Sequence, residues 1–386
     1  MVMHKVAFVT GSRADYGIMR NYLKLMHEDE TFDLKILATG ALLDNTYGHQ
    51  VDLIYQDGFD VAVEIPIDLD SSSNCTILHS MSIALDCFAD YFSKVSYDLL
   101  IILGDRFEML PVAIAASMQK IPILHVHGGE ATFANYDEFI RHAITKMSLF
   151  HFTSTEEYRR RVIQLGEDPE RVFNLGALGA ENCLYIDEKN VPQEIIDLPE
   201  KQYFVVLFHP ETLTTSSEAE QVTELLSAIC RKSTYKYVFI GSNADTNSNI
   251  IRDKIKKYVE EHDNADYYEN LHTDAYHYLV KHSVCLIGNS SSGIIEAPSL
   301  GVYTINIGKR QDGRVRGNSI IDVECDAEKI EDAMAHVLTI KGNAFPINPY
   351  YQENSAQKYY KATQTILSKL LRIYGQKPKI FYDISF

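Results

Sequence analysis

The sequence predicts an α/β fold of two Rossmann-like, doubly wound domains that face each other across a cleft. Short runs rich in Val, Ile and Leu alternate with amphipathic stretches along the chain, a pattern typical of parallel strands buried on both faces. The chain has 386 residues, which is enough for two domains of ordinary size. The alternation pauses once, in a polar stretch with two prolines at residues 187–201. That stretch is expected to link the domains.

The first domain is expected to cover residues 1–185. Its apolar runs predict strands, in chain order KVAFVT, LKILAT, VAVEIPI, DLLIILG, IPILHVH, LFHFTS and RVFNLG. Between them apolar residues recur at steps of three and four, which predicts helices near residues 14–28, 49–56, 75–94, 107–119, 137–147 and 156–165.

The second domain is expected to cover residues 200–353. Its strand series consists of the runs YFVVLFHP, YKYVFIG, ADYYEN, AYHYLVKH, SVCLIGN, VYTINIG and SIIDV. Helices are expected near residues 218–231, 248–261 and 327–338, with a short one from residue 293. A last long helix is expected over residues 354–374, within the C-terminal segment 354–386.

Charge and composition narrow the function classes. Lys and Arg number 36 and Asp and Glu number 53, so the formal net charge is −17, which disfavours nucleic acid or an anionic membrane as partner. No run approaches the roughly 18 apolar residues of a spanning helix, and no signal-peptide core is recognised at the N-terminus. The six cysteines lack metal-binding spacings and are expected to be small buried residues in a reducing compartment. We therefore expect a cytoplasmic enzyme.

Polar residues follow the predicted strands, where ligands of such sheets bind. After the first strand, Gly11 and Ser12 precede Arg13 at a helix start, which suits an anion; the alternative is a plain turn with a surface arginine. The turn has neither a GxGxxG nor a Walker sequence, so neither a dinucleotide cofactor nor a Walker-type ATP site is expected. After the fourth strand, Asp105 and Arg106 are expected to point into the cleft, unless Asp105 caps the next helix.

The fifth strand ends in HVHGGE. Alternation places His125 and His127 on one face, with Glu130 on the same rim, and the two glycines let a ligand approach the backbone. A metal site, contacts to a polar substrate and a core histidine are the alternatives. We expect substrate contacts and no metal, because the further ligand and ordered surroundings of a metal site are not identified. On the next helix, Asp137 and Arg141 are four residues apart, which favours a surface ion pair.

In the second domain, His209 lies before a proline at a strand end, and Asn243 follows the next strand. The segment GNSSSGIIE places Ser290 and Ser291 at a helix start, which predicts a phosphate cradle of N–H groups and hydroxyls; ordinary serine capping is the alternative. Glu296 suits a ribose diol better than a phosphate. A cationic cluster follows, consisting of Lys309, Arg310, Arg314 and Arg316. These features indicate a nucleotide diphosphate in the second domain and a polar group, such as a sugar, against the first.

The motifs GSRADYG, GDRFE, HVHGGE, NYDEFIRH, FHPET, GSNAD, GNSSSGIIE and IGKRQ occur in this order over both domains. Together they resemble the UDP-N-acetylglucosamine 2-epimerase family, and most closely its hydrolysing branch, which makes N-acetylmannosamine for bacterial sialic acid synthesis. The resemblance implies the glycosyltransferase-B arrangement, with the last helix crossing back to the first domain. It also implies the substrate UDP-N-acetylglucosamine, no cofactor, and a homodimer or homotetramer.

The reaction that the resemblance implies has two steps. A base removes the proton on C2 of the sugar while UDP leaves by anti elimination, and a 2-acetamidoglucal forms. Water then adds, C2 is protonated on the opposite face, and N-acetylmannosamine and free UDP result. Because the C2 proton is not acidic, the C1–oxygen bond must break early and the enzyme must stabilise the departing diphosphate.

The resemblance also implies roles for individual residues. Those expected to contact the nucleotide sugar are Arg13, Arg106, Ser290, Ser291 and Arg310 at the diphosphate, Glu296 at the ribose, the backbone near Leu271 at the uracil, and His209 and Asn243 at the sugar–phosphate region. The expected proton-transfer carboxylates are Asp105, Glu130 and Asp137. Many relatives carry HxEGGE, with a catalytic glutamate where this chain has His127, so that role passes to His127, Glu130 or another group. Our hypothesis is that Asp105 or Asp137 takes the C2 proton and that His127 stabilises charge or relays a proton.

Four other functions fit the same architecture. They are a hydrolysing 2-epimerase of UDP-2,4-diacetamido-trideoxyglucose for legionaminic acid synthesis, a non-hydrolysing epimerase, a glycosyltransferase and a non-catalytic nucleotide-sugar sensor. Release of free UDP separates the hydrolysing from the non-hydrolysing epimerases. A glycosyltransferase needs an acceptor, and a sensor binds UDP without turnover.

Overall fold

A computed structural model describes residues 3–45, 48–133, 135–211, 217–241, 248–340, 346–375 and 377–384. The first domain is built on a parallel sheet of seven strands in the order β3-β2-β1-β4-β5-β6-β7. The strands are β1 (His4–Thr10), β2 (Phe32–Thr39), β3 (Val61–Ile65), β4 (Leu99–Leu103), β5 (Ile123–Val126), β6 (Phe150–Thr153) and β7 (Val172–Asn174). All seven coincide with runs predicted to be strands.

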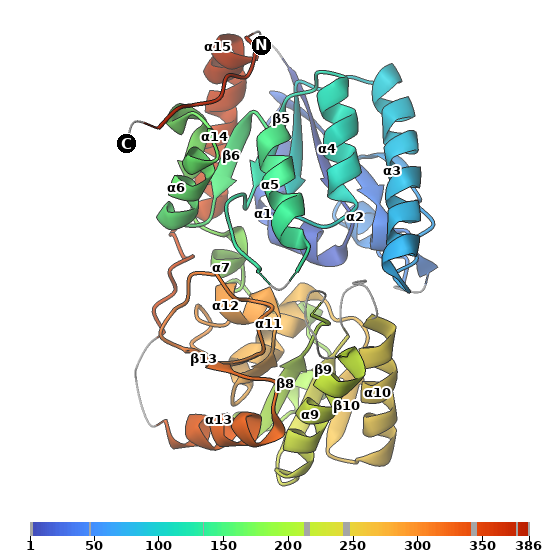
Figure 1. The fold of residues 1–386 in the computed structure, drawn as a ribbon, viewed down its shortest axis with the longest axis vertical. Coiled ribbons are helices and arrows are strands. Elements are labelled where there is room, and N and C mark those ends of the chain that lie inside the picture. Colours follow the sequence, from blue (N-terminus) through green and yellow to red (C-terminus); the bar gives the residue numbers. More distant parts are fainter. Residues whose placement is uncertain are drawn as a thin grey trace.

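Helices cover both faces of this sheet (Figure 1). They are α1 (Arg13–His27), α2 (Asp52–Gln56), α3 (Asn74–Lys94), α4 (Met109–Met118), α5 (Asp137–Met147), α6 (Glu156–Gln164) and α7 (Leu178–Asn182). Strand β1 shows how the layers form: Val6 and Phe8 pack with α1 on one face, while Ala7 and Val9 pack with α3 and α4 on the other. Both faces of the strand are therefore apolar, which explains its uninterrupted apolar sequence.

The second domain has a parallel sheet of six strands in the order β10-β9-β8-β11-β12-β13. Its strands are β8 (Tyr203–Leu207), β9 (Lys236–Ile240), β10 (Ala265–Tyr268), β11 (Leu286–Gly288), β12 (Thr304–Ile307) and β13 (Ile320–Val323). Its helices are α8 (Gln193–Ile196), α9 (Glu218–Cys230), α10 (Ser248–Glu261), α11 (Thr273–His282), α12 (Ser291–Ile295) and α13 (Ala327–Thr339). The prediction of two doubly wound α/β domains is confirmed.

Two predictions about local structure are wrong. The run AYHYLVKH lies in helix α11, where Ala275 and Leu279, one turn apart, face the core, so its period is that of a helix. The cysteines are not uniformly buried, since Cys75 and Cys230 are exposed; all six are free thiols. The apolar neighbours of a cysteine in the sequence do not determine which way it points from a helix.

The last helix that the structure describes lies beside the first domain (Figure 1). It comprises α14 (Ser355–Thr365), a π-helical turn at Ile366–Leu370 and α15 (Leu371–Tyr374). Tyr359 and Ile366 belong to the core of the first sheet, and the Tyr22 hydroxyl lies 2.6 Å from Thr363 Oγ1. Within the described part of the chain, we find no helix with the length and apolar character needed to cross a membrane.

Candidate active site

Two adjoining cavities lie between the domains, where the carboxyl ends of strands from both sheets meet. The serine cavity, of about 150 Å³, is lined by residues that include Arg13, His209, Leu271, Ser290 and Ser291. The carboxylate cavity, of about 110 Å³, is lined by residues that include Asp15, Asp105, His127, Glu130 and Arg314. Five residues line both cavities, namely Ile18, Gly179, Ser291, Ser292 and Glu296. A ligand can therefore occupy both at once.

The serine turn, residues 289–292, forms one wall of the serine cavity. Strand β11 ends at Gly288, whose φ of +144° no other residue adopts easily; a Cβ there would lie 1.9 Å from the Leu207 carbonyl oxygen. Ser290 then caps α12, and its hydroxyl accepts the Ser292 N–H at 3.4 Å. Ser290, Ser291 and Ser292 all line the cavity, and N–H groups and hydroxyls at a helix start are groups that suit an anion.

Segments from two neighbouring strand ends fix the serine turn. The Asn289 side chain bonds the His209 backbone twice, accepting the N–H at 2.7 Å and donating to the carbonyl at 2.9 Å. The Asn289 carbonyl accepts Arg310 Nη1 at 3.1 Å and Gln311 Nε2 at 2.7 Å. Arg310 therefore lies directly behind the turn, although it is not among the residues that line either cavity.

The first domain contributes Arg13 to the serine cavity. Helix α1 begins at Arg13 and is capped by Ser12, and the guanidinium donates to the carbonyl of Leu271 across the domain boundary. Burial lowers the pKa of Arg13 to about 10, so the side chain stays charged at neutral pH. The predicted proximity of Arg13 and Leu271 to the serine turn thus agrees with the cavity lining.

Glu296 ends α12 and accepts a hydrogen bond from His277 Nε2 at 3.2 Å. Its carboxylate also abuts the first domain, because a Cβ on Gly179 would lie 2.8 Å from Glu296 Oε1.

Arg106 donates from Nε to Glu108 Oε1 at 2.6 Å. The predicted Asn243 lies outside the described residues.

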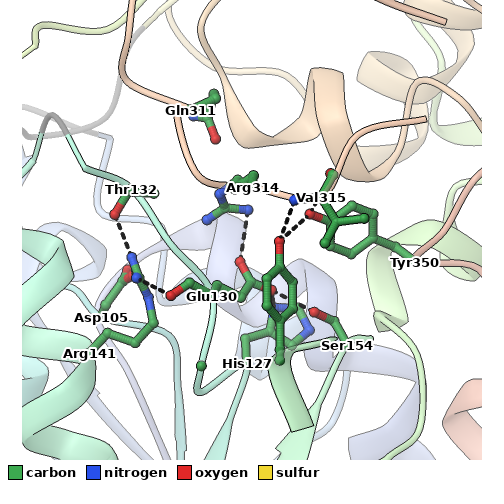
Figure 2. A network of polar contacts seen from close by, with 12 residues as sticks. Asp105, His127, Glu130, Thr132, Arg141, Ser154, Gln311, Arg314, Val315 and Tyr350 are labelled. Carbon is green, nitrogen blue, oxygen red and sulfur yellow. Dashed lines mark hydrogen bonds and ion pairs between the residues drawn. The ribbon is translucent and has the colours of Figure 1, made fainter. Parts of the chain in front are cut away.

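Asp105 lines the carboxylate cavity, and Figure 2 shows it beside Arg141. Arg141 contacts its Oδ2 through both Nε, at 2.7 Å, and Nη2, at 2.5 Å. Among the described residues, none hydrogen-bonds Oδ1. Burial raises the pKa of Asp105, but the charges of Arg141 and Arg314 outweigh it and hold the pKa below its usual value. Asp105 is therefore ionised at neutral pH, with one oxygen available.

His125 and His127 do not share a face, and this prediction is wrong. Strand β5 ends at Val126, and His127 takes a left-handed φ of +67°. His125 is buried in the core, where Nδ1 lies 3.0 Å from Thr145 Oγ1 and Nε2 lies 2.8 Å from the Gly104 carbonyl. Burial lowers the pKa of His125 to about 3. It is a neutral core histidine with both ring nitrogens occupied, and not a metal or substrate ligand.

His127 instead lines the carboxylate cavity. Its Nδ1 lies 3.6 Å from Glu130 Oε1, and within the described structure its buried Nε2 has no hydrogen-bond partner. Burial lowers the pKa of His127, although Glu130 opposes the shift. Glu130 is itself buried, with Oε1 accepting from Ser154 Oγ at 2.7 Å and Oε2 lying 2.8 Å from Arg314 Nη1.

The expected surface ion pair of Asp137 and Arg141 is not the one that forms. Arg141 is fully buried and contacts Asp105 and Glu138, because α5 presents this side of the helix to the strand ends. Asp137 lies half-buried in the first turn of α5 and does not line either cavity. The structure thus brings Asp105, His127 and Glu130 together, while Asp137 lies apart from them.

From the sequence alone, Asp15 is given no role, and Arg314 is placed only in the cationic cluster that follows the serine turn. Asp15 lies in the first turn of α1, and burial raises its pKa to about 6 against the opposing charge of Arg106. Arg314 enters the carboxylate cavity from the second domain. Asp15 lies two residues after Arg13 in the GSRADYG motif, and this position could have identified it as a candidate site residue. The partner of Arg314 lies in the other domain, and no local sequence pattern identifies it.

Comparisons with known proteins agree with these features. The family model for UDP-N-acetylglucosamine 2-epimerase matches residues 24–364. Polysialic acid biosynthesis protein P7 of Escherichia coli is 46% identical over 99% of this chain and 98% of its own, and the UDP-N,N′-diacetylbacillosamine 2-epimerase (hydrolyzing) of Legionella pneumophila is 33% identical over 95% and 97%. A crystal structure of UDP-GlcNAc 2-epimerase from Neisseria meningitidis bound to UDP-GlcNAc has a TM-score of 0.76 at 17% identity, covering 94% of this chain and 100% of that one. The chain belongs to the UDP-N-acetylglucosamine 2-epimerase family.

Proposed function

We propose that this protein is a hydrolysing 2-epimerase that converts UDP-N-acetylglucosamine and water to N-acetylmannosamine and UDP. The observation that carries the proposal is the continuity of the two cavities, which share residues of the serine turn and Glu296. A diphosphate in the serine cavity would present its sugar directly to the cavity that holds Asp105 and His127. The 46% identical relative is named for polysialic acid biosynthesis, which supports a step that supplies sialic acid.

The nucleotide half of the substrate is assigned to the serine cavity. The hydroxyls of Ser290 and Ser291 and the charge of Arg13 hold the diphosphate, since charge-assisted hydrogen bonds suit a doubly charged group. Arg310 and Arg106, which line neither cavity, add positive charge near it. Glu296 accepts hydrogen bonds from the ribose hydroxyls, the Leu271 backbone hydrogen-bonds the uracil, and His209 contacts the sugar–phosphate junction. The relative from Neisseria meningitidis was solved bound to UDP-GlcNAc, which supports the nucleotide sugar as ligand.

In the first step Asp105 Oδ1 takes the C2 proton as the C1–oxygen bond breaks and the electron pair leaves with UDP. A carboxylate with a lowered pKa is a weak base, so it depends on positive charge developing at C1 to acidify the C2 proton. The cations around the diphosphate stabilise the leaving group at the same moment. Of the two carboxylates considered as base, the cavity lining favours Asp105 over Asp137.

The second step adds water to the glucal. His127 is neutral, and its Nδ1 faces Glu130, which favours the tautomer with a free lone pair on Nε2. Nε2 therefore accepts the proton of the water that attacks C1. Asp15, whose pKa is raised to about 6, carries a proton near neutral pH more often than an ordinary aspartate does. It delivers that proton to C2 from the face opposite Asp105.

Proton NMR of the purified protein with UDP-N-acetylglucosamine in deuterated water tests the proposal. Expected are free UDP and N-acetylmannosamine that carries deuterium at C2. A UDP-linked product would indicate a non-hydrolysing epimerase, and a hydrolysed sugar without deuterium at C2 would exclude the elimination. Dependence on an added acceptor would indicate a glycosyltransferase.

A second substrate is favoured by one specific observation, the 33% identical relative named as a UDP-N,N′-diacetylbacillosamine epimerase. The same assay with that nucleotide sugar decides between the two, by comparison of kcat/KM. We expect the higher value for UDP-N-acetylglucosamine; a higher value for the diacetamido sugar would assign the protein to that reaction instead.

Matched variants test the choice of base. Asp105→Asn is expected to abolish deuterium incorporation at C2 while UDP still binds. Asp137→Asn is expected to retain incorporation, because Asp137 does not line the cavity. Full loss in Asp137→Asn with retention in Asp105→Asn would reverse the assignment.

A further inference from the structure

One loop of the second domain, residues 308–316, connects the serine turn to the carboxylate cavity. Its first half is fixed behind the serine turn: the N–H groups of Lys309 and Arg310 donate to Glu211 Oε1 at 2.6 and 3.1 Å. Gln311 donates to the Asn289 carbonyl, at the start of the turn, at 2.7 Å. A displacement of the serine turn is therefore expected to displace this loop as well.

The second half of the loop crosses to the first domain (Figure 2). Arg314 Nη1 lies 2.8 Å from Glu130 Oε2, and the Val315 N–H donates to the Tyr158 hydroxyl at 2.8 Å. The Phe133 N–H donates to the Asp312 carbonyl at 3.2 Å. The contacts with Glu130 and Phe133 join the loop to the segment that follows β5, which also carries His127, and the contact with Tyr158 joins it to α6.

The loop packs tightly against the first domain. Gly313 has a φ of +86°, and a Cβ there would lie 2.6 Å from the ring of Phe133 and 2.7 Å from the Ala131 side chain. The backbone of the loop therefore touches the other domain, which only glycine allows in this conformation. This contact is possible only while the domains are closed on each other.

Arg314 of the loop and Glu130 of the first domain form a buried ion pair. Glu130 is 2% exposed and the Arg314 side chain is 9% exposed, so neither charge is well solvated. The charge of Glu130 raises the pKa of Arg314 against its burial. If the domains separated, the Glu130 carboxylate would keep Ser154 but lose Arg314, the only arginine that lies against this carboxylate among the described residues. Because a buried charge without a partner is unstable, the pair distinguishes a closed from an open arrangement.

We propose that Arg314 is a positioning residue that couples nucleotide binding at the serine turn to the arrangement of Glu130 and His127 in the carboxylate cavity. The inference rests on the proposed function for its chemistry, and it assigns Glu130 a role as the anchor of Arg314 rather than as a proton carrier. Glu130 Oε1 lies 3.6 Å from Nδ1 of His127, so docking of the loop fixes the Glu130 carboxylate beside the His127 ring. Nucleotide binding at the serine turn is therefore expected to stabilise the docked loop and, with it, the arrangement of the carboxylate cavity.

Hydrogen exchange with UDP as the probe tests the coupling without any activity measurement. In the wild type, UDP is expected to slow exchange at the Phe133 and Val315 amides, which form the contacts across the boundary. In Arg314→Gln, UDP is expected to bind with its Kd changed less than about threefold, since the diphosphate ligands are intact, but without slowing exchange at Phe133. Arg314→Lys, which keeps the charge, is expected to retain protection if the glutamine variant proves unstable.

The outcomes distinguish a failure of the proposed function from a failure of the coupling alone. UDP that does not bind the wild type at all would remove both the proposed function and the coupling. UDP that binds but leaves Phe133 exchange unchanged would overturn the coupling alone. Arg231→Gln, which removes an exposed ion pair with Glu331 on the same domain, is the matched control and is expected to behave as the wild type.

Kinetics provide the second readout. Because a misplaced catalytic group costs about a hundredfold in rate, Arg314→Gln and Glu130→Gln are each expected to lower kcat by about that factor with little change in KM. The double variant is expected to be no worse than either single one, since both changes break the same contact. Equal losses in kcat/KM and in UDP affinity would make Arg314 a phosphate ligand and overturn the proposal, as would additive losses in the double variant.

Discussion

Arg141 offers the sharpest test of how the carboxylate cavity is held together. Its guanidinium, with the side chain 1% exposed, contacts Asp105 Oδ2 and Glu138 Oε2, each at 2.7 Å. It also donates to the Glu130 carbonyl at 2.7 Å and to Thr132 Oγ1 at 2.5 Å. Every donor direction of the side chain is used, so no shorter or neutral side chain can replace it.

The burial of Arg141 determines how much stability Arg141→Gln is expected to lose. Removal of one partner of a buried ion pair costs about 3–5 kcal/mol, because the remaining charge is left uncompensated. The carboxylates of Asp105 and Glu138 keep 21% and 24% of their exposure, so water can stabilise them in part. For Arg141→Gln we therefore expect the lower end of this range, a loss of about 3 kcal/mol.

Urea unfolding followed by circular dichroism at neutral pH measures this loss. Arg160→Gln is the matched control, because Arg160 forms an exposed ion pair with Glu156 at 3.7 Å and its removal is worth less than about 1 kcal/mol. If Arg141→Gln were destabilised no more than Arg160→Gln, the buried charge network would not stabilise the domain as described.

The pH dependence of stability checks the same network. Burial raises the pKa of Glu138, but hydrogen bonds from His142 and Arg141 outweigh it and lower the pKa to about 2, from 4.5. The stability that this carboxylate contributes is therefore complete above pH 4.5 and is lost as the pH falls toward 2. Arg141→Gln is expected to lose less stability over this interval than the wild type, and an equal loss would contradict the assignment.

Three further substitutions have distinct expected results. Gly288→Ala is expected to destabilise the second domain by more than about 1–3 kcal/mol in thermal unfolding, because its Cβ would lie 1.9 Å from the Leu207 carbonyl; an unchanged melting temperature would refute the turn geometry. Glu296→Gln is expected to weaken UDP binding about tenfold in calorimetry, since a hydrogen bond to a charged group contributes about 1.5–3 kcal/mol, and 2′,3′-dideoxy-UDP should show no such difference. Lys379→Met is expected to speed proteolysis of the C-terminal tail, because Lys379 lies 2.8 Å from the buried Glu167; mass spectrometry of the fragments would show it, and unchanged cleavage would contradict it.

The fold could be predicted because its central strands, such as β4 and β8, are buried on both faces, while the strands β3, β10 and β13 are less buried. Each of the central strands appears in the sequence as a short apolar run, and the helices between the strands repeat at their own period. The error at AYHYLVKH has the same physical basis: α11 carries four aromatic or histidine rings, which resemble a strand, while its buried residues Ala275 and Leu279 follow the helical period.

Most of the candidate site that could be predicted consists of side chains that closely follow a strand end, and Glu296, which follows α12, is an exception. Arg13, Asp105 and Ser291 follow strand ends in this way and line the cavities. Partners from other elements could not be predicted, since their contacts depend on tertiary packing. The burial of Arg141 depends on how α5 sits against the strand ends, and the contact of Arg314 with Glu130 depends on how the two domains meet.

A crystal structure of the protein with UDP tests the central claim most directly. The diphosphate is predicted to lie within about 3 Å of the hydroxyl or N–H groups of Ser290 and Ser291, with the terminal phosphate toward the carboxylate cavity and Asp105. A bound UDP whose phosphates lie outside the serine cavity, or whose terminal phosphate faces away from Asp105, would contradict it.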